Sequence, residues 1–215
     1  MPSKFEKLLP YAGVLAGVLF AIGGFLPKTS DELGDPHAVA IMHDNATRNV
    51  IGAVAMALFC VAMLFFAAAL RRVLRSGEAG ESSYSGVAYA GAILVGASQA
   101  AVAWLIFAGT EAANHHDKTA VSTLSYLGIN SWLPWVAASA AMFLATGLGG
   151  LHNAVLPRWL AIVTLVLGVA CLLGPAGVAV YFATPVWLIV TGIVVARRQE
   201  AERPTFVHAT ASQFS

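Results

Sequence analysis

The chain has 215 residues, of which 58% are hydrophobic and only 11% are charged. Soluble domains carry about a quarter charged residues, so this composition excludes a water-soluble enzyme, a nucleic-acid-binding protein and a disordered protein. A mean hydropathy of +0.75 and a net charge of +1 instead predict an all-α integral membrane protein, with the lipid bilayer as its surroundings and no nucleic acid as a partner.

Apolar segments of membrane-spanning length follow one another along the chain. Because a span needs about 20 mostly apolar residues, the first four expected spans cover residues 8–26, 50–70, 86–109 and 132–151. The stretch from 159 to 196 is too long for one crossing and contains a Gly-Pro-Ala-Gly turn signal, so we expect two further spans at 159–173 and 176–196. The sequence thus predicts a single domain, residues 1–203, built as a six-transmembrane-helix bundle, and a disordered cytoplasmic tail at 204–215.

Basic residues are unevenly divided between the two sides that these spans define. The side that includes the N-terminus carries Lys4, Lys7, Arg71, Arg72, Arg75, Arg158, Arg197, Arg198 and Arg203. The opposite side carries only Lys28, Arg48 and Lys118. Under the positive-inside rule, this asymmetry predicts a multi-pass protein with both termini in the cytoplasm.

The two longer loops on the opposite side each contain a helix-start signal. Asp35-Pro36 has the form of an N-cap followed by a proline in the first turn, which predicts a short helix over 37–46. Asp117 has the form of a second N-cap, for a helix over 118–127 that ends at Gly128 in the left-handed conformation. We therefore expect two short helices on the outer surface.

Small residues recur at every fourth position in the third and fourth spans. The two series are Ala88, Ala92, Gly96, Ala100 and Ala137, Ala141, Ala145, Gly149. Such spacing lets membrane helices approach closely, so we predict that these spans pack together with Gly96 and Ala141 at the contact. The alternative is that small residues are merely abundant here. Gln99 is interpreted as an interhelical hydrogen-bonding residue, with a ligand contact as the alternative.

The outer loops contain histidines and carboxylates that could share a metal ion. Glu111 and His115 are four residues apart and would share a helix face. His116 follows directly, and the first outer loop supplies His37 and His43. Imidazole and carboxylate groups suit zinc and similar divalent metals, which gives an outward-facing metal site as one hypothesis. The alternative is that these side chains are separately solvated.

A family resemblance rests on motifs spread along the chain. These are Ala-Leu-Arg-Arg-Val-Leu-Arg at 69–75, Leu-Pro-Arg-Trp-Leu at 156–160, Leu-Leu-Gly-Pro at 172–175 and the closing pair Arg197-Arg198. With an outer helix leading into the second span, the chain resembles the small six-span membrane proteins of unknown function common in actinobacteria. The resemblance covers most of the chain, implies a bacterial plasma membrane, and carries over no active-site residues.

Three functions are compatible with these features. The leading hypothesis is a non-enzymatic protein that binds a small apolar or amphiphilic molecule between its helices, or that acts as a subunit beside a membrane-protein partner or a second copy of itself. The alternative is a membrane enzyme using the outer histidines and Glu111 around a divalent metal, its only expected cofactor. A small-solute carrier is the third, although no ionisable residue lies near the middle of a span.

Overall fold

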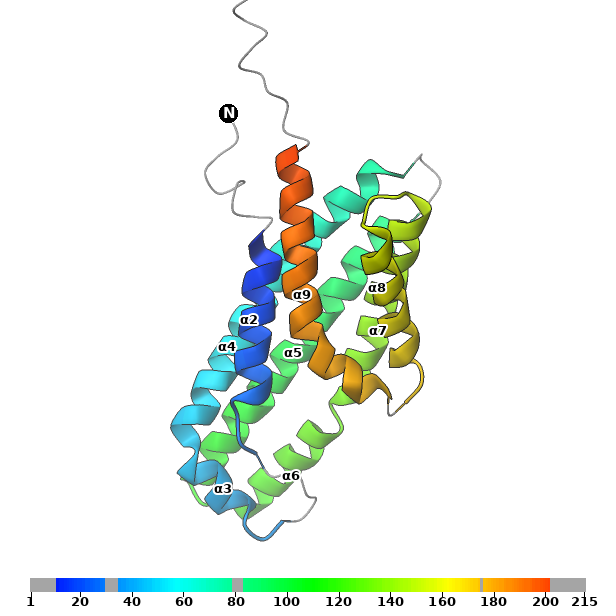
Figure 1. The fold of residues 1–215 in the computed structure, drawn as a ribbon. Helices are drawn as coiled ribbons and strands as arrows, with labels where there is room; N and C mark the ends of the chain where they lie inside the picture. Colours follow the sequence, from blue (N-terminus) through cyan, green and yellow to red (C-terminus); the bar gives the residue numbers. More distant parts are fainter. Residues whose placement is uncertain (1–10, 30–34, 79–82, 175, 202–215) are drawn as a thin grey trace, which may run out of the picture.

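The computed structural model describes residues 11–29, 35–78, 83–174 and 176–201, and within these residues the secondary structure is entirely helical (Figure 1). In chain order the helices are α2 (Ala12–Phe25), α3 (Ala38–Asp44), α4 (Ala46–Ser76), α5 (Tyr84–Asn114), α6 (Lys118–Ile129), α7 (Trp132–His152), α8 (Arg158–Cys171) and α9 (Ala176–Ala201). The expected tail at 204–215 and the first residues of the span at 8–26 lie outside the described residues.

Four helices are long and apolar enough to cross a membrane: Ala46–Ser76, Tyr84–Asn114, Lys118–His152 and Ala176–Arg198. The third of these combines α6 and α7. Helices α2 and α8 are apolar but have only 14 residues each. At 1.5 Å per residue such a helix extends about 21 Å, which is less than the roughly 30 Å of a hydrocarbon core. By length and composition, four described helices are therefore able to cross a membrane, whereas the sequence predicted six spans.

The long helices α4 and α5 run side by side and organise the bundle (Figure 1). Helix α2 packs between α4 and α9, and α7 packs between α5 and α8. Helices α3 and α6 lie together beside the lower part of α5, at the end of the molecule opposite the described ends of the chain (Figure 1). We call α3 and α6 the cap, and the opposite end the terminal end.

The two cap helices differ from their predicted lengths. Helix α3 spans only Ala38–Asp44, and the Asp35 carboxylate accepts a hydrogen bond from the backbone N–H of His37 at 2.8 Å. Asp117 does cap α6, because its carboxylate accepts from the Ala120 N–H at 3.0 Å. The predicted stop at Gly128 was wrong, since Gly128 lies inside α6 and the helix ends at Ile129. A glycine without a left-handed φ does not terminate a helix.

Glycines allow the closest approaches between helices. A Cβ atom added to Gly13 of α2 would lie 2.7 Å from the Cα of Gly192 in α9. A Cβ added to Gly91 of α5 would lie 2.7 Å from the backbone nitrogen of Met142 in α7. These distances mean that the backbones themselves are in contact, which is how membrane helices gain packing energy when lipid is as apolar as leucine.

Helix α9 changes direction along its length, as Figure 1 shows. Pro185 lies inside this helix, and a proline there removes one backbone hydrogen bond and bends the axis. Beyond the proline, Ile189 and Gly192 pack against α2. Before it, Tyr181 and Phe182 face cavities that are described below. The part of α9 before the bend is therefore the part that lines both of these cavities.

Candidate functional site

The five residues proposed as metal ligands all belong to the cap region and are exposed. His37 precedes α3 and His43 lies in its last turn. Glu111 lies in the last turn of α5, His115 follows that helix, and His116 occupies the turn toward α6 with a φ of 55°.

Folding of the cap brings two of these side chains together. The rings of His43 and His116 have centroids 5.4 Å apart. Among the described residues, no group of three or more His, Cys, Asp or Glu side chains is arranged to hold a metal ion. The pair joins α3 to the turn before α6, but the metal hypothesis, which needs three converging ligands, gains no support from this geometry.

The three residues predicted at helix contacts, Gly96, Ala141 and Gln99, lie in different surroundings. Gly96 is buried and faces Met63 and Cys60 of α4, rather than α7. Ala141 is half-buried, one position before the α5–α7 contact at Met142. Gln99 was expected to hydrogen-bond a neighbouring helix, yet its Oε1 is buried and has no hydrogen-bond partner. Its side chain lines a cavity instead.

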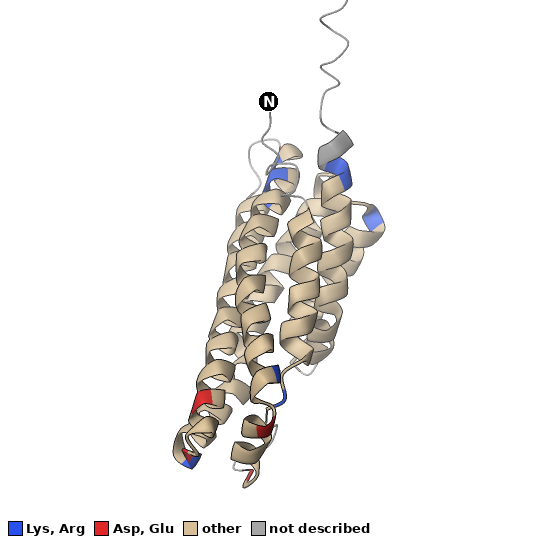
Figure 2. Cartoon of the chain, turned by 90° about the vertical axis from the view of Figure 1, so that its left-hand side faces the viewer, with Lys and Arg blue, Asp and Glu red and all other residues tan. Residues whose placement is uncertain are grey.

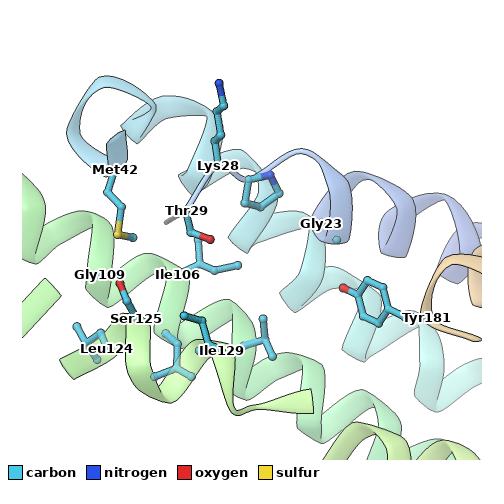
Figure 3. Close-up of a pocket in the computed structure, with 15 residues that line it drawn as sticks. Gly23, Lys28, Thr29, Met42, Ile106, Gly109, Leu124, Ser125, Ile129 and Tyr181 are labelled. Atoms are coloured by element: carbon cyan, nitrogen blue, oxygen red, sulfur yellow. The ribbon is translucent and has the colours of Figure 1, made fainter. Parts of the chain in front are cut away.

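A cavity of about 330 Å³ lies beneath the cap, and we call it the cap cavity. Its walls come from the end of α2 and the chain after it, from Met42 of α3, and from α5, α6 and α9. Figure 3 shows the Thr29, Met42 and Tyr181 side chains directed toward this space, whereas the Lys28 side chain extends away from it. The wall combines hydroxyl groups, including that of Ser125, with aliphatic side chains.

A second cavity, of about 320 Å³, lies between α5, the start of α7 and the start of α9, and we call it the lateral cavity. Its lining residues are Gln99, Val102, Gly128, Ser131, Trp132, Trp135, Val136, Gly177, Val178, Tyr181 and Phe182. Three of them form an exposed rim: Trp132 is 51% exposed, and Val178 and Phe182 are each 60% exposed. The cavity is therefore bordered by apolar side chains that face outward from the bundle.

The two cavities share part of their walls. Val102 of α5, Gly128 of α6 and Tyr181 of α9 line both. The Tyr181 ring is fixed by neighbours, with its centroid 4.8 Å from that of Phe20 and 5.1 Å from that of Trp135. A Cβ added to Gly128 would meet nothing within 4 Å, so the space beside this glycine is open. We call these three shared residues the neck.

Two buried polar groups at the lateral cavity have no partner in the protein. Gln99 and Trp135 are each 2% exposed, and neither Gln99 Oε1 nor Trp135 Nε1 makes a hydrogen bond. Buried polar side-chain atoms are usually paired, and leaving one unpaired costs about 1–3 kcal/mol. One of these atoms is an acceptor and the other is a donor, and both side chains line the lateral cavity.

Sequence reasoning identified part of this site. Gln99 stood out as the strongly polar residue within a span, but its partner was expected to be another helix. Trp135 and Tyr181 carry no local signal in the sequence, since aromatic residues near a helix end are also typical of the membrane interface. Their common cavity is formed by residues of α5, α7 and α9 that are far apart in the sequence, which no residue spacing shows. In comparisons with protein-family models, curated proteins and solved structures, nothing matches the chain.

Proposed function

We propose that the chain is a six-span protein of a bacterial plasma membrane, with both termini in the cytoplasm and the cap on the outer surface. Charge placement supports this topology: Lys and Arg are concentrated at the terminal end, and acidic residues at the cap (Figure 2). The acidic residues within or next to the cap are Asp35, Asp44, Glu111 and Asp117. Membership of the actinobacterial six-span family is part of the same proposal.

The short helices α2 and α8 are compatible with this topology. Each begins near the terminal end. Helix α2 packs along α4, which is long enough to span, and α8 packs along α7, whose 21 residues extend about 31 Å. A helix shorter than the bilayer is accommodated by local thinning at modest cost. Single cysteines at Ser83 and Ser122, in a background with Cys60→Ala and Cys171→Ala, test the arrangement. We expect an impermeant thiol reagent added outside intact cells to label position 122 and not position 83.

We further propose that the protein binds a single-chain amphiphile in the lateral cavity. The observation that carries this proposal is the exposed apolar rim formed by Trp132, Val178 and Phe182 around a cavity that also contains buried polar groups. In a bilayer such a rim faces lipid acyl chains, so the hydrocarbon chain of an amphiphile can enter from the lipid side between α7 and α9. The head group would then point toward the neck and the hydroxyl-bearing cap cavity.

Apolar ligand sites with a few fixed polar groups are the usual form of a small-molecule pocket, at volumes of about 300–1,000 Å³. The lateral cavity falls within this range at about 320 Å³. A chain-binding function also fits the absence of Asp, Glu, Lys, Arg and His among the described residues that line it. Ion-coupled transport normally requires such residues within the membrane, so the lining favours binding over proton-driven export.

Photocrosslinking tests the proposal directly. The probe is octadecanol with a diazirine in mid-chain, added to the full-length protein in lipid nanodiscs, with the crosslinked peptides mapped by mass spectrometry. We expect labelling of the α7 and α9 segments that border the lateral cavity. The variant Gly128→Leu fills the neck without a backbone collision, because nothing lies within 4 Å of the added Cβ, and we expect it to reduce that labelling about tenfold.

Gly86→Leu is the matched control. Gly86 is exposed on α5, also has nothing within 4 Å of an added Cβ, and lines neither cavity. We expect this variant to label like the wild type. Labelling that is spread equally over the exposed apolar surface, or that Gly128→Leu leaves unchanged, would contradict a specific chain-binding site.

A further inference from the structure

We infer that the lateral cavity selects an uncharged amphiphile whose head group carries a hydroxyl, and that Gln99 and Trp135 recognise this hydroxyl. The inference rests on the proposed function, because it specifies the head group of the molecule bound at the same site. It starts from the two unpaired polar atoms, Gln99 Oε1 and Trp135 Nε1, in side chains that line one cavity.

The two groups have complementary requirements. The indole N–H of Trp135 can only donate a hydrogen bond, and the Oε1 of Gln99 can only accept one. A hydroxyl is the smallest group that accepts from the first and donates to the second. The recognition requires Gln99 to present Oε1, since an amide N–H in its place would be met equally well by an ether oxygen, which only accepts.

The lining of the cavity disfavours a charged head group. No Asp, Glu, Lys, Arg or His belongs to the described wall of the lateral cavity, and a charge without a partner is strongly penalised in a low-dielectric site. Among the described residues that line the two cavities, the cationic one is Lys28 of the cap cavity, and its side chain extends away from that space (Figure 3). A carboxylate or phosphate head would therefore lose its hydration without gaining a counter-charge.

The position of Gln99 is compatible with a ligand whose aliphatic chain extends out of the lateral cavity past its exposed rim. Gln99 lies one helical turn before Val102 of the neck, on the same α5 face. The exposed rim residues Val178 and Phe182 belong to α9, across the cavity from α5. A hydroxyl held at Gln99 thus leaves the aliphatic chain of the ligand free to extend over α9 into the surrounding lipid.

Competition against the crosslinking probe tests the inference. The unlabelled competitors are octadecanol, octadecyl methyl ether and octadecanoate, the last at a pH where it is ionised. We expect octadecanol to compete about tenfold better than the ether, which cannot donate a hydrogen bond, and better than octadecanoate by more than that. In Gln99→Leu the preference for octadecanol over the ether should fall to about twofold or less.

Ser139→Ala is the matched control, because Ser139 is also buried with an unpaired hydroxyl but does not line either cavity. This variant should keep the wild-type preference. Trp135→Phe provides a second measurement if Gln99→Leu fails to fold: it should weaken competition by octadecanol and by the ether alike, because the oxygen of each accepts from the indole N–H. Equal competition by alcohol and ether, a preference unchanged in Gln99→Leu, or strongest competition by octadecanoate would overturn the inference. Each of these results would leave Gly128-sensitive labelling intact, so the proposed chain-binding site is tested separately.

Discussion

Two buried tryptophans show how differently the two halves of the bundle are built. Trp187 of α9 is 4% exposed, and its Nε1 donates to Thr164 Oγ1 of α8 at 2.8 Å. Its ring meets those of Phe143 and Phe66 edge-on, with centroids 4.7 Å and 6.0 Å away. Trp135 of α7 is equally buried, yet its Nε1 has no partner and its ring borders the lateral cavity.

This difference between Trp187 and Trp135 distinguishes a residue that stabilises the fold from a residue that is available to a ligand. Around Trp187, each requirement of the indole is met by the protein, through a hydrogen bond and close aromatic neighbours. Around Trp135, burial is achieved without pairing. Unpaired buried hydroxyls also occur at Thr146 and Thr191, nearer the terminal end, but Gln99 and Trp135 in addition line a cavity. The half of the bundle next to the cap is therefore the half in which we place binding.

The sharpest test exchanges each tryptophan for phenylalanine. We expect Trp187→Phe to reduce the free energy of unfolding by about 3 kcal/mol, because it removes packed ring volume and the hydrogen bond to Thr164. Trp135→Phe removes an unpaired donor and should change the free energy of unfolding by less than about 1 kcal/mol in either direction. Thermal unfolding of the ligand-free variants in one detergent measures both.

Similar losses in the two variants would remove the distinction between the halves. Such a result would mean that Trp135 contributes packing energy comparable to that of Trp187, despite the adjoining cavity. A larger loss in Trp135→Phe than in Trp187→Phe would reverse the comparison.

A glycine pair tests the same contrast without changing any polar group. A Cβ added to Gly147 of α7 would lie 2.8 Å from the backbone nitrogen of Leu165 in α8, whereas one added to Gly128 would meet nothing within 4 Å. We expect Gly147→Ala to destabilise the protein by about 2 kcal/mol through overpacking. Gly128→Ala should stabilise α6 by up to about 1 kcal/mol, the usual gain for alanine within a helix. Unfolding curves of both variants provide the measurement, and a loss in Gly128→Ala would show that the neck is less open than described.

The sequence predicted the helical segments well because hydropathy and turn residues act locally. The turn at Gly174, with a φ of 61°, separates α8 from α9 as expected, and Asp117 caps α6 as expected. The number of membrane crossings is less well determined, since α2 and α8 are shorter than the apolar segments that suggested them. Helix length depends on where the backbone turns, which composition alone does not specify.

The candidate site could be predicted only in part, because it depends on contacts between distant segments. Gln99 was recognisable from its polarity within an apolar span, but the sequence does not show that its Oε1 is unpaired or that it shares a cavity with Trp135 of α7. The histidines show the converse. Their residue types suggested a metal site, and the cap brings only His43 and His116 within ring contact.

The smallest expected change in the free energy of unfolding comes from relieving backbone strain. It tests whether the cap half and the terminal half differ in side-chain packing only. His116 in the cap and Ala154 at the terminal end both have a left-handed φ, of 55° and 50°. This conformation costs a non-glycine residue roughly 1 kcal/mol, so His116→Gly and Ala154→Gly should each raise the free energy of unfolding by up to about 1 kcal/mol. His115→Gly is the control, since His115 has a φ of −90° and gains nothing from glycine.

Equal gains in the free energy of unfolding for His116→Gly and Ala154→Gly would show that backbone strain is similar in the two halves, which leaves side-chain packing as their difference. If Ala154→Gly stabilises and His116→Gly does not, the ring contact between His43 and His116 must contribute as much as the strained backbone costs, and that contact would then be what holds α3 to the turn before α6.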